Sequence, residues 1–132
     1  MRDTAAALKA FFSGFGLPAY AVGSVPKGVE LPYITFPLAE PEWHTKATFY
    51  AQIWVRDTEN TALFAKADEI LRAIGTGRRL FTDAGVIVIW PESPAMQLMV
   101  DGEIRSAYLN FSINSYHLPG TLGRGPEEGE TP

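Results

Sequence analysis

The residues best suited to bind a metal ion lie in one short stretch of the chain. Glu40, Glu42 and His44 alternate there, and two carboxylates with an imidazole are ligands that zinc accepts. Pro41 interrupts the alternation, however, and no second group of acidic residues or histidines follows at a known ligand spacing. We therefore interpret this segment as a solvated loop and expect the protein to need no metal and no other cofactor.

Neither the serines nor the glycines form a recognisable catalytic motif. No serine lies in a Gly-x-Ser-x-Gly sequence between a strand and a helix, so a hydrolase is unsupported. The glycines at Gly75 and Gly77 lack the Lys-Ser/Thr pair of a phosphate-binding loop, and the end of a helix explains them. Arg78 and Arg79 follow, where they either form a short basic patch for phosphate or for an acidic partner surface, or complement the negative end of that helix. We expect no enzymatic activity.

Large aromatic side chains occupy the polar side of a long predicted strand. Residues 45–56 alternate strictly between apolar and polar types, but the polar side carries rings where charges are usual. Tyrosine and tryptophan are enriched in the cores of protein interfaces. Either this side contacts another subunit, or helices and loops of the same chain cover it. The candidate contact residues are Tyr50, Gln52, Trp54, Arg56, Tyr108 and Tyr116, together with Arg78 and Arg79.

The composition limits the chain to a single small domain. Its 132 residues, 46% of them hydrophobic, are enough for one modest core. The net charge of -4 disfavours nucleic acid as a partner, because phosphate binding needs clustered lysines and arginines. The absence of cysteine excludes disulfides and thiolate chemistry. No run of about eighteen apolar residues is present, so we expect a soluble, cytoplasmic protein that does not span a membrane.

Two amphipathic helices are predicted where apolar residues recur every three or four positions. The first follows Asp3 or Thr4, either of which can cap it. The second is predicted to start after a cap at Asp57 or Thr58 and to end at Gly75.

Strands are predicted where apolar residues alternate or form short β-branched runs. Pro32 and Pro37 should push one of them toward a sheet edge or a strand end, because proline donates no ladder hydrogen bond. Pro91 and Pro94 should stop another. The predicted strands cover residues 19–24, 31–38, 45–56, 85–90, 96–100 and 103–118.

The folded part of the chain is predicted to close with a long hairpin. Asp101 and Gly102, which tolerate positive φ at both positions, mark its turn. The order of helices and strands favours an α+β fold, with an antiparallel or mixed sheet of about four to six strands and two helices packed on one face. We expect residues 1–118 to form one domain. Residues 119–132, rich in Gly, Pro and Glu, are predicted to be a flexible acidic tail.

This order of elements is similar to that of a known group of viral proteins. The segment Tyr50–Asp57, Tyr-Ala-Gln-Ile-Trp-Val-Arg-Asp, runs straight into a helix that starts Thr-Glu-Asn-Thr-Ala. A Pro-flanked strand, Pro32-Tyr33-Ile34-Thr35-Phe36, precedes it, and a hairpin follows. From about residue 3 to residue 118 the chain resembles the tail terminator and tail completion proteins of long-tailed bacteriophages and prophages.

The resemblance implies a structural function in the head-to-tail junction of a virion. Such a subunit forms a ring, often a hexamer, that caps the tail tube and then joins it to the head, without catalysis or cofactor. Its partners would be further copies of itself, the tail tube protein and a head-side connector, and it would be assembled in the bacterial cytoplasm. Independently, a ring needs contacts that continue from copy to copy, and sheet edges or long hairpins supply them. The strand at 45–56 and the hairpin at 96–117 are the candidates.

A second hypothesis belongs to another functional class. The chain could be a small cytoplasmic enzyme or ligand-binding protein with a pocket between the sheet and the helices. Trp43, His44 and Trp90 would then lie near the mouth of that pocket.

Overall fold

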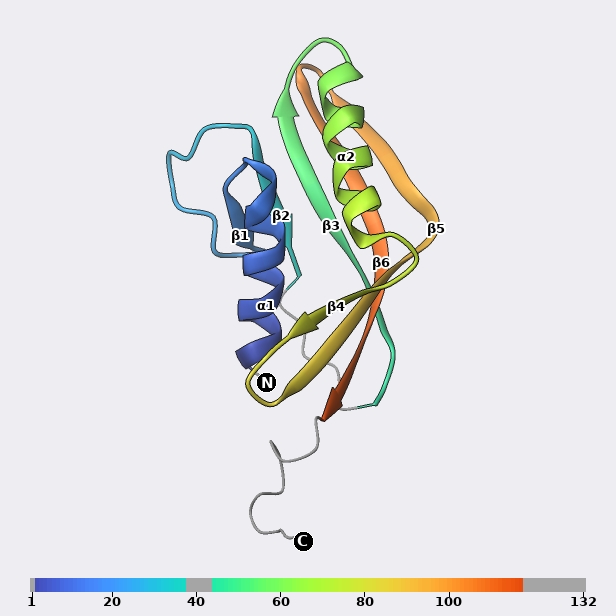
Figure 1. Ribbon diagram of the computed structural model, residues 1–132. Coiled ribbons are helices and arrows are strands. Elements are labelled where there is room, and N and C mark those ends of the chain that lie inside the picture. The colour runs from blue at the N-terminus through green and yellow to red at the C-terminus, as the bar shows by residue number, and fades with distance from the viewer. Residues whose placement is uncertain (1, 38–43, 118–132) are drawn as a thin grey trace, which may run out of the picture.

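The computed structural model describes residues 2–37 and 44–117 (Figure 1). One mixed six-stranded sheet has the order β1-β2-β3-β6-β5-β4, in which β1 and β2 are parallel and all other neighbours are antiparallel. This confirms the predicted α+β fold. The elements are α1 (Arg2–Phe12), the short 3-10 helix η1 (Ser13–Phe15), β1 (Ala19–Ala21), β2 (Tyr33–Phe36), β3 (Ala47–Arg56), α2 (Thr61–Ile74), β4 (Arg78–Phe81), β5 (Gly85–Asp101) and β6 (Ile104–His117).

Both helices pack on the same face of the sheet (Figure 1). Phe12 of α1 lies with its ring centroid 6.1 Å from that of Phe36 and 6.0 Å from that of Phe111. The buried side of α2 consists of Leu63, Ala67, Ile70 and Ile74, spaced as one helical stripe requires. Lys66 of α2 donates a hydrogen bond of 2.6 Å to the carbonyl oxygen of Phe15, which links the two helical segments. None of the described helices is long and apolar enough to span a membrane.

The strict alternation in the long strand is confirmed. Ala51 and Ile53 of β3 are completely buried beneath the helices. The next strand, β6, continues the pattern, since Ile53 pairs with the buried Ala107. Because directly opposed residues of neighbouring strands share a face, the apolar positions of all strands meet in one core.

The second helix begins later than predicted. Its N-cap residue is Asn60, not Asp57 or Thr58, and the Asn60 side chain makes no capping hydrogen bond. Asp57 instead accepts hydrogen bonds at Oδ1 from the backbone N–H groups of Thr58, at 2.7 Å, and Glu59, at 3.1 Å. The carboxylate therefore closes a turn ahead of the helix. The end of the helix at Gly75 is as predicted, and the Gly75 N–H donates to Leu71.

The prediction that Pro91 and Pro94 stop a strand is wrong. β5 runs unbroken through both prolines, and a register shift between Pro91 and Met96 takes up the residues that do not pair. β4 pairs only with residues 86–89 of β5, so the prolines lie where β6 is the only described neighbour. Proline is tolerated at such an edge because few ladder donors are needed there. The strand β4 itself was not predicted.

The other proline-flanked strand, β2, lies between β1 and β3 and is therefore not at a sheet edge. Pro32 and Pro37 sit just outside its two ends, so the prediction of a strand end is the correct alternative.

The turn of the β5–β6 hairpin differs in detail from the prediction. Gly102 has φ 62°, but Asp101 has no positive φ and still pairs with Ile104. Gly102 and Glu103 therefore form the two-residue loop, with glycine at its first position, as in type II′ turns.

Candidate interaction surface on the open face of the sheet

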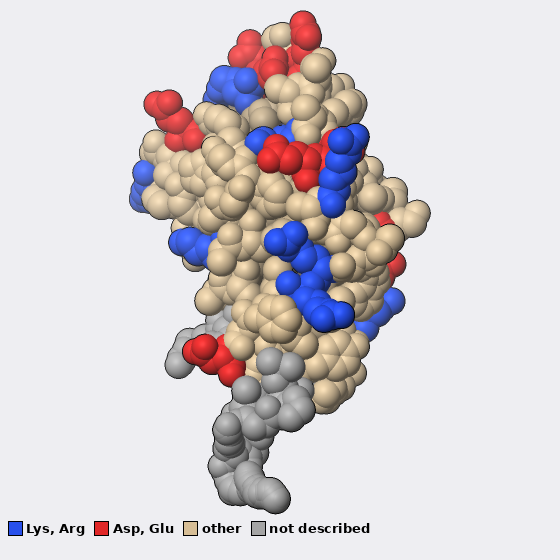
Figure 2. Space-filling view, viewed as in Figure 1, with Lys and Arg blue, Asp and Glu red and all other residues tan. Residues whose placement is uncertain are grey.

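The face of the sheet that points away from the helices, called here the open face, carries most of the predicted contact residues. Three pairs of directly opposed residues, which share a face, lie on it: Tyr50 with Asn110, Gln52 with Tyr108, and Trp54 with Ser106. The helix-covered side shows acidic and basic side chains interspersed over its surface (Figure 2). The middle of the open face consists instead of uncharged polar and aromatic side chains.

Two tyrosines form the centre of this surface. The rings of Tyr50 and Tyr108 have centroids 4.7 Å apart and an interplanar angle of 31°. Tyr50 nevertheless keeps 44% of its surface exposed. A ring pair held by its own packing offers a partner a large contact area at a small cost in side-chain entropy.

Hydrogen bonds fix the neighbouring side chains. Trp54 Nε1 donates to Thr35 Oγ1 at 3.0 Å, and Gln52 Nε2 donates to Ser106 Oγ at 3.4 Å. Thr35 and Ser106 are both buried, so each bond joins an accessible side chain to a fixed one. The surface is thus organised before any partner arrives, which lowers the cost of binding.

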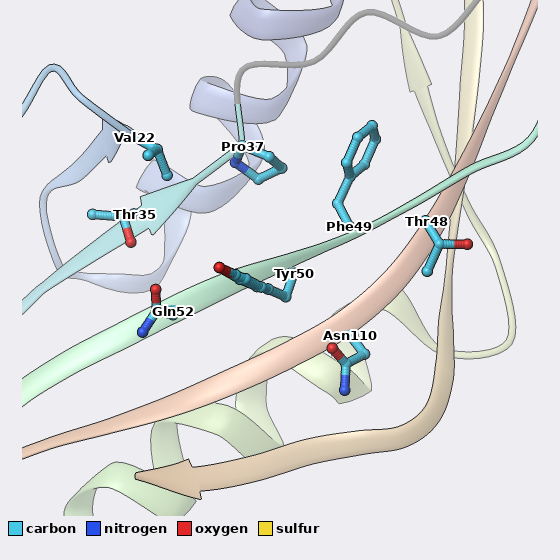
Figure 3. A pocket seen from close by; sticks show the side chains of 8 residues that line it. All are labelled: Val22, Thr35, Pro37, Thr48, Phe49, Tyr50, Gln52 and Asn110. Carbon is cyan, nitrogen blue, oxygen red and sulfur yellow. The ribbon is translucent and has the colours of Figure 1, made fainter. Parts of the chain in front are cut away.

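A groove of about 480 Å³ crosses this surface (Figure 3). Figure 3 shows side chains of β2, β3 and β6 around it, Tyr50 among them. Among the described residues, those that line the groove are all uncharged, which suits uncharged groups of a partner or ligand. The lining residues are Val22, Thr35, Pro37, Thr48, Phe49, Tyr50, Gln52 and Asn110.

A polar network borders the groove where β5 changes register. Ser112 Oγ donates to Glu92 Oε2 at 2.6 Å and lies 2.8 Å from Thr48 Oγ1. Lys46 Nζ lies 3.5 Å from the same carboxylate oxygen. The hydrogen bond from Ser112, supported by the charge of Lys46, lowers the pKa of Glu92 below its ordinary value. Asn110 Nδ2 donates to the carbonyl oxygen of Pro94 at 2.6 Å, which anchors the bulge itself.

The arginines divide between the two faces. Arg56 is exposed at the end of β3 and lies 3.9 Å from Glu103. Arg79 is opposite Val88 and so lies on the open face. Arg78 is opposite Ile89 and lies on the helix-covered face, so it is not part of the open face, and its place at a subunit contact stays a prediction. Its Nη1 donates to the carbonyl oxygen of Ala73 at 3.2 Å, near the end of α2, as complementation of the helix predicts.

Tyr116 is on the same strand as Tyr108 but near the opposite end of the open face. It is opposite Val86, and its ring centroid lies 5.4 Å from that of His44. The structure therefore brings Tyr50, Gln52, Trp54 and Tyr108 together and leaves Tyr116 in a separate group.

The predicted pocket between sheet and helices does not have the expected mouth. Trp90 is opposite Ser112 on the open face, so it points away from the helices. Trp43 lies outside the described residues, as do Glu40 and Glu42 of the possible metal site. Within the described parts of the chain, no group of three His, Asp or Glu side chains is placed to hold a metal ion.

Comparison of the chain with protein-family models gives no match, and comparison with curated proteins gives none either.

Sequence reasoning missed the polar residues that border the groove. Thr48, Asn110 and Ser112 stand at alternating strand positions, so the phase of the alternation already placed them on the side of Tyr50. Glu92 carried no such signal, because it follows Pro91 and the strand was expected to end there. Only the observed continuation of β5 brings its carboxylate within hydrogen-bond distance of Ser112.

Proposed function

We propose that this chain is a structural subunit of the head-to-tail junction of a long-tailed bacteriophage or prophage. In this proposal it acts as a tail terminator: copies form a ring that caps the tail tube and then joins it to the head. The support comes from the resemblance in the order of elements and from the chemistry of the open face. The proposal assigns the chain no reaction and no cofactor, and it places the assembled protein in the tail or neck of the virion.

One observation carries the proposal: Tyr50, Gln52, Trp54 and Tyr108 form a continuous, pre-organised surface on the helix-free face of the sheet. In a sheet with one solvated face, each strand normally alternates apolar residues that point to the core with charged residues that point to the solvent. Here the centre of the outward face has rings and amides, the residue types that favour binding to protein surfaces. A tube of repeated subunits offers such a partner surface many times over.

The test is binding to tail tubes. Purified protein is mixed with tubes assembled from the tail tube protein of the same genome, and electron microscopy scores capped ends. We expect rings at tube ends, and we expect Tyr50→Ala combined with Tyr108→Ala to reduce capping. Phe64→Ala, which removes an exposed ring from α2 on the other side of the molecule, is the matched control. Uncapped tubes at saturating protein would refute the proposal.

The groove supports a second candidate function, binding of a small uncharged ligand. Its volume of about 480 Å³ and its combination of aromatic and neutral hydrogen-bonding side chains suit such a ligand. In this case Tyr50→Ala would abolish ligand binding. The wild-type protein would then show no ring in light scattering and would not cap tail tubes.

A further inference from the structure

The sheet has two outer edges, and each includes a stretch with no described strand beside it. β1 forms one edge. At the other, β4 covers residues 86–89 of β5, which leaves residues 96–101 of β5 paired with β6 alone. In an antiparallel strand every second residue directs its N–H and C=O groups to the outer side. Residues 96–101 therefore present a row of backbone donors and acceptors that an added strand could use.

The side chains of this edge make it unsuited to permanent contact with water. Leu98, Met99 and Val100 are consecutive and are 37%, 54% and 50% exposed. The stretch 95–100 contains no charged residue, and its nearest proline is Pro94. Charges and prolines are the usual means of blocking an edge strand. The edge at β1 is likewise uncharged, and Val22 directly after it is 56% exposed. Burying residues 95–100 of one copy against β1 of another would therefore desolvate no charged side chain of these two stretches.

The two open stretches lie at the same level of the sheet. One row of directly opposed residues crosses it from Ala19 through Ile34, Ile53 and Ala107 to Leu98. The adjacent row, on the open face, runs from Tyr20 through Thr35, Gln52 and Tyr108 to Gln97. A copy placed beside the first without a shift along the strands thus brings its β1 next to residues 96–98 of β5. The strand directions also fit, because β5 runs opposite to β1 and the new pair is antiparallel.

We infer that residues 96–100 of β5 bind the β1 edge of a second copy, so that the sheet continues from subunit to subunit. The contact is heterologous, since it uses a different edge of each copy, and it can close into a ring. All copies then present their open faces, with Tyr50 and Trp54, to the same side of the ring. The inference rests on the proposed function in one respect only: the closing of the continued sheet into a ring is taken from that function.

The absence of cysteine from the chain allows a direct test by disulfide trapping. Tyr20→Cys and Gln97→Cys in one chain place the two thiols on the open face of the new strand pair. Under mild oxidation we expect a ladder of covalent multimers on denaturing gels and the loss of most monomer. A shift of two residues keeps the faces matched, so Tyr20→Cys with Met99→Cys covers the neighbouring register.

The matched control is Tyr20→Cys with Leu98→Cys, in which the thiols point to opposite faces and should stay largely monomeric. A second variant, Leu98→Lys, adds a charge at an already exposed position and should lower the assembled fraction several-fold without changing the circular dichroism spectrum. The inference is overturned if neither same-face pair gives more multimer than the control. It is also overturned if Gln97→Cys alone, which can link at most two chains, forms disulfide dimers as efficiently as the same-face pairs form multimers, since that would mean that two β5 edges pair with each other.

Failure of the inference and failure of the proposed function give different results. Capped tubes without disulfide ladders would refute the edge contact and leave the tail function standing. Ladders of multimers that do not bind tubes would support the edge contact and refute the tail function.

Discussion

The Arg105 guanidinium of β6, next to the turn of the β5–β6 hairpin, donates from Nε to the carbonyl oxygen of Asp57 at 3.0 Å. It also donates to the carbonyl oxygen of Thr58 at 3.0 Å and to the side chain of Asn60. One cation therefore satisfies three acceptors in the turn that leads from β3 into α2. This explains why the turn is ordered although the side chain of Asn60, the N-cap residue, makes no capping bond.

Arg105→Ala should lower the free energy of unfolding by about 2 kcal/mol, the usual value for hydrogen bonds to a charged group. Arg105→Lys should recover only part of this, because an ammonium group cannot reproduce the fork of N–H donors. Urea denaturation measures both. Arg72→Ala, on the solvent side of α2, should change stability little. Equal losses for Arg105→Ala and Arg72→Ala would contradict the role assigned to the guanidinium.

Trp54→Phe should destabilise the protein by about 1 kcal/mol, because the Thr35 hydroxyl loses its donor. The bond from Trp54 Nε1 to Thr35 Oγ1 measures 3.0 Å, and Thr35 is only 8% exposed. A double-mutant cycle with Thr35→Val separates the hydrogen bond from the loss of ring area. If the two substitutions prove additive, the bond contributes nothing to stability.

The stability of the protein should depend on pH through Glu92. Its folded-state pKa is lowered by the Ser112 hydrogen bond, so the carboxylate stabilises the fold above the ordinary value of 4.5, and this contribution is lost as the pH falls through the lowered pKa. Melting temperatures of wild type and Glu92→Gln should differ most above pH 4.5 and converge below it. Glu59→Gln shows how much of the trend comes from net charge alone. A constant difference across the pH range would disprove this assignment.

Arg56→Glu should weaken assembly without unfolding the subunit. Arg56 lies at a rim of the open face, and its pair with Glu103 at 3.9 Å is exposed on both sides, so the fold gains little from it. Sedimentation velocity should show a lower assembled fraction, with a stronger effect at low salt. Arg72→Glu is the control for a charge change remote from the open face. Unchanged sedimentation of Arg56→Glu would count against a contact at this rim.

Alternation was the property that the sequence predicted best. The alternation correctly placed Tyr50, Gln52 and Trp54 on the side of β3 that faces away from the buried side chains of Ala51 and Ile53. It could do so because successive residues of a strand point to its two sides in turn. The same pattern placed Tyr108 on that side. Which of these residues touch depends on the register between strands that are distant in the chain, and alternation alone cannot supply it.

Proline produced the main error. Its missing N–H is costly only where a ladder bond would form, and that depends on the neighbouring strand. At Pro91 the outer neighbour β4 has already ended, so the strand continues. The four-residue β4 escaped prediction because Arg78 and Arg79 read as the end of a helix. Arg78 does donate a hydrogen bond to the C-terminal part of α2, but Arg78 itself belongs to β4.

β5 has described neighbouring strands on both sides along its first part only, and this affects how its backbone moves. Its first part lies between β4 and β6, whereas residues 96–101 have β6 alone among the described strands. In the isolated subunit, the outward amide protons of residues 96–101 should exchange with deuterium far sooner than those of residues 86–89. Mass spectrometry of exchanged peptides can follow these two parts of one strand separately, and slower exchange at 96–101 would report when and where a neighbour arrives.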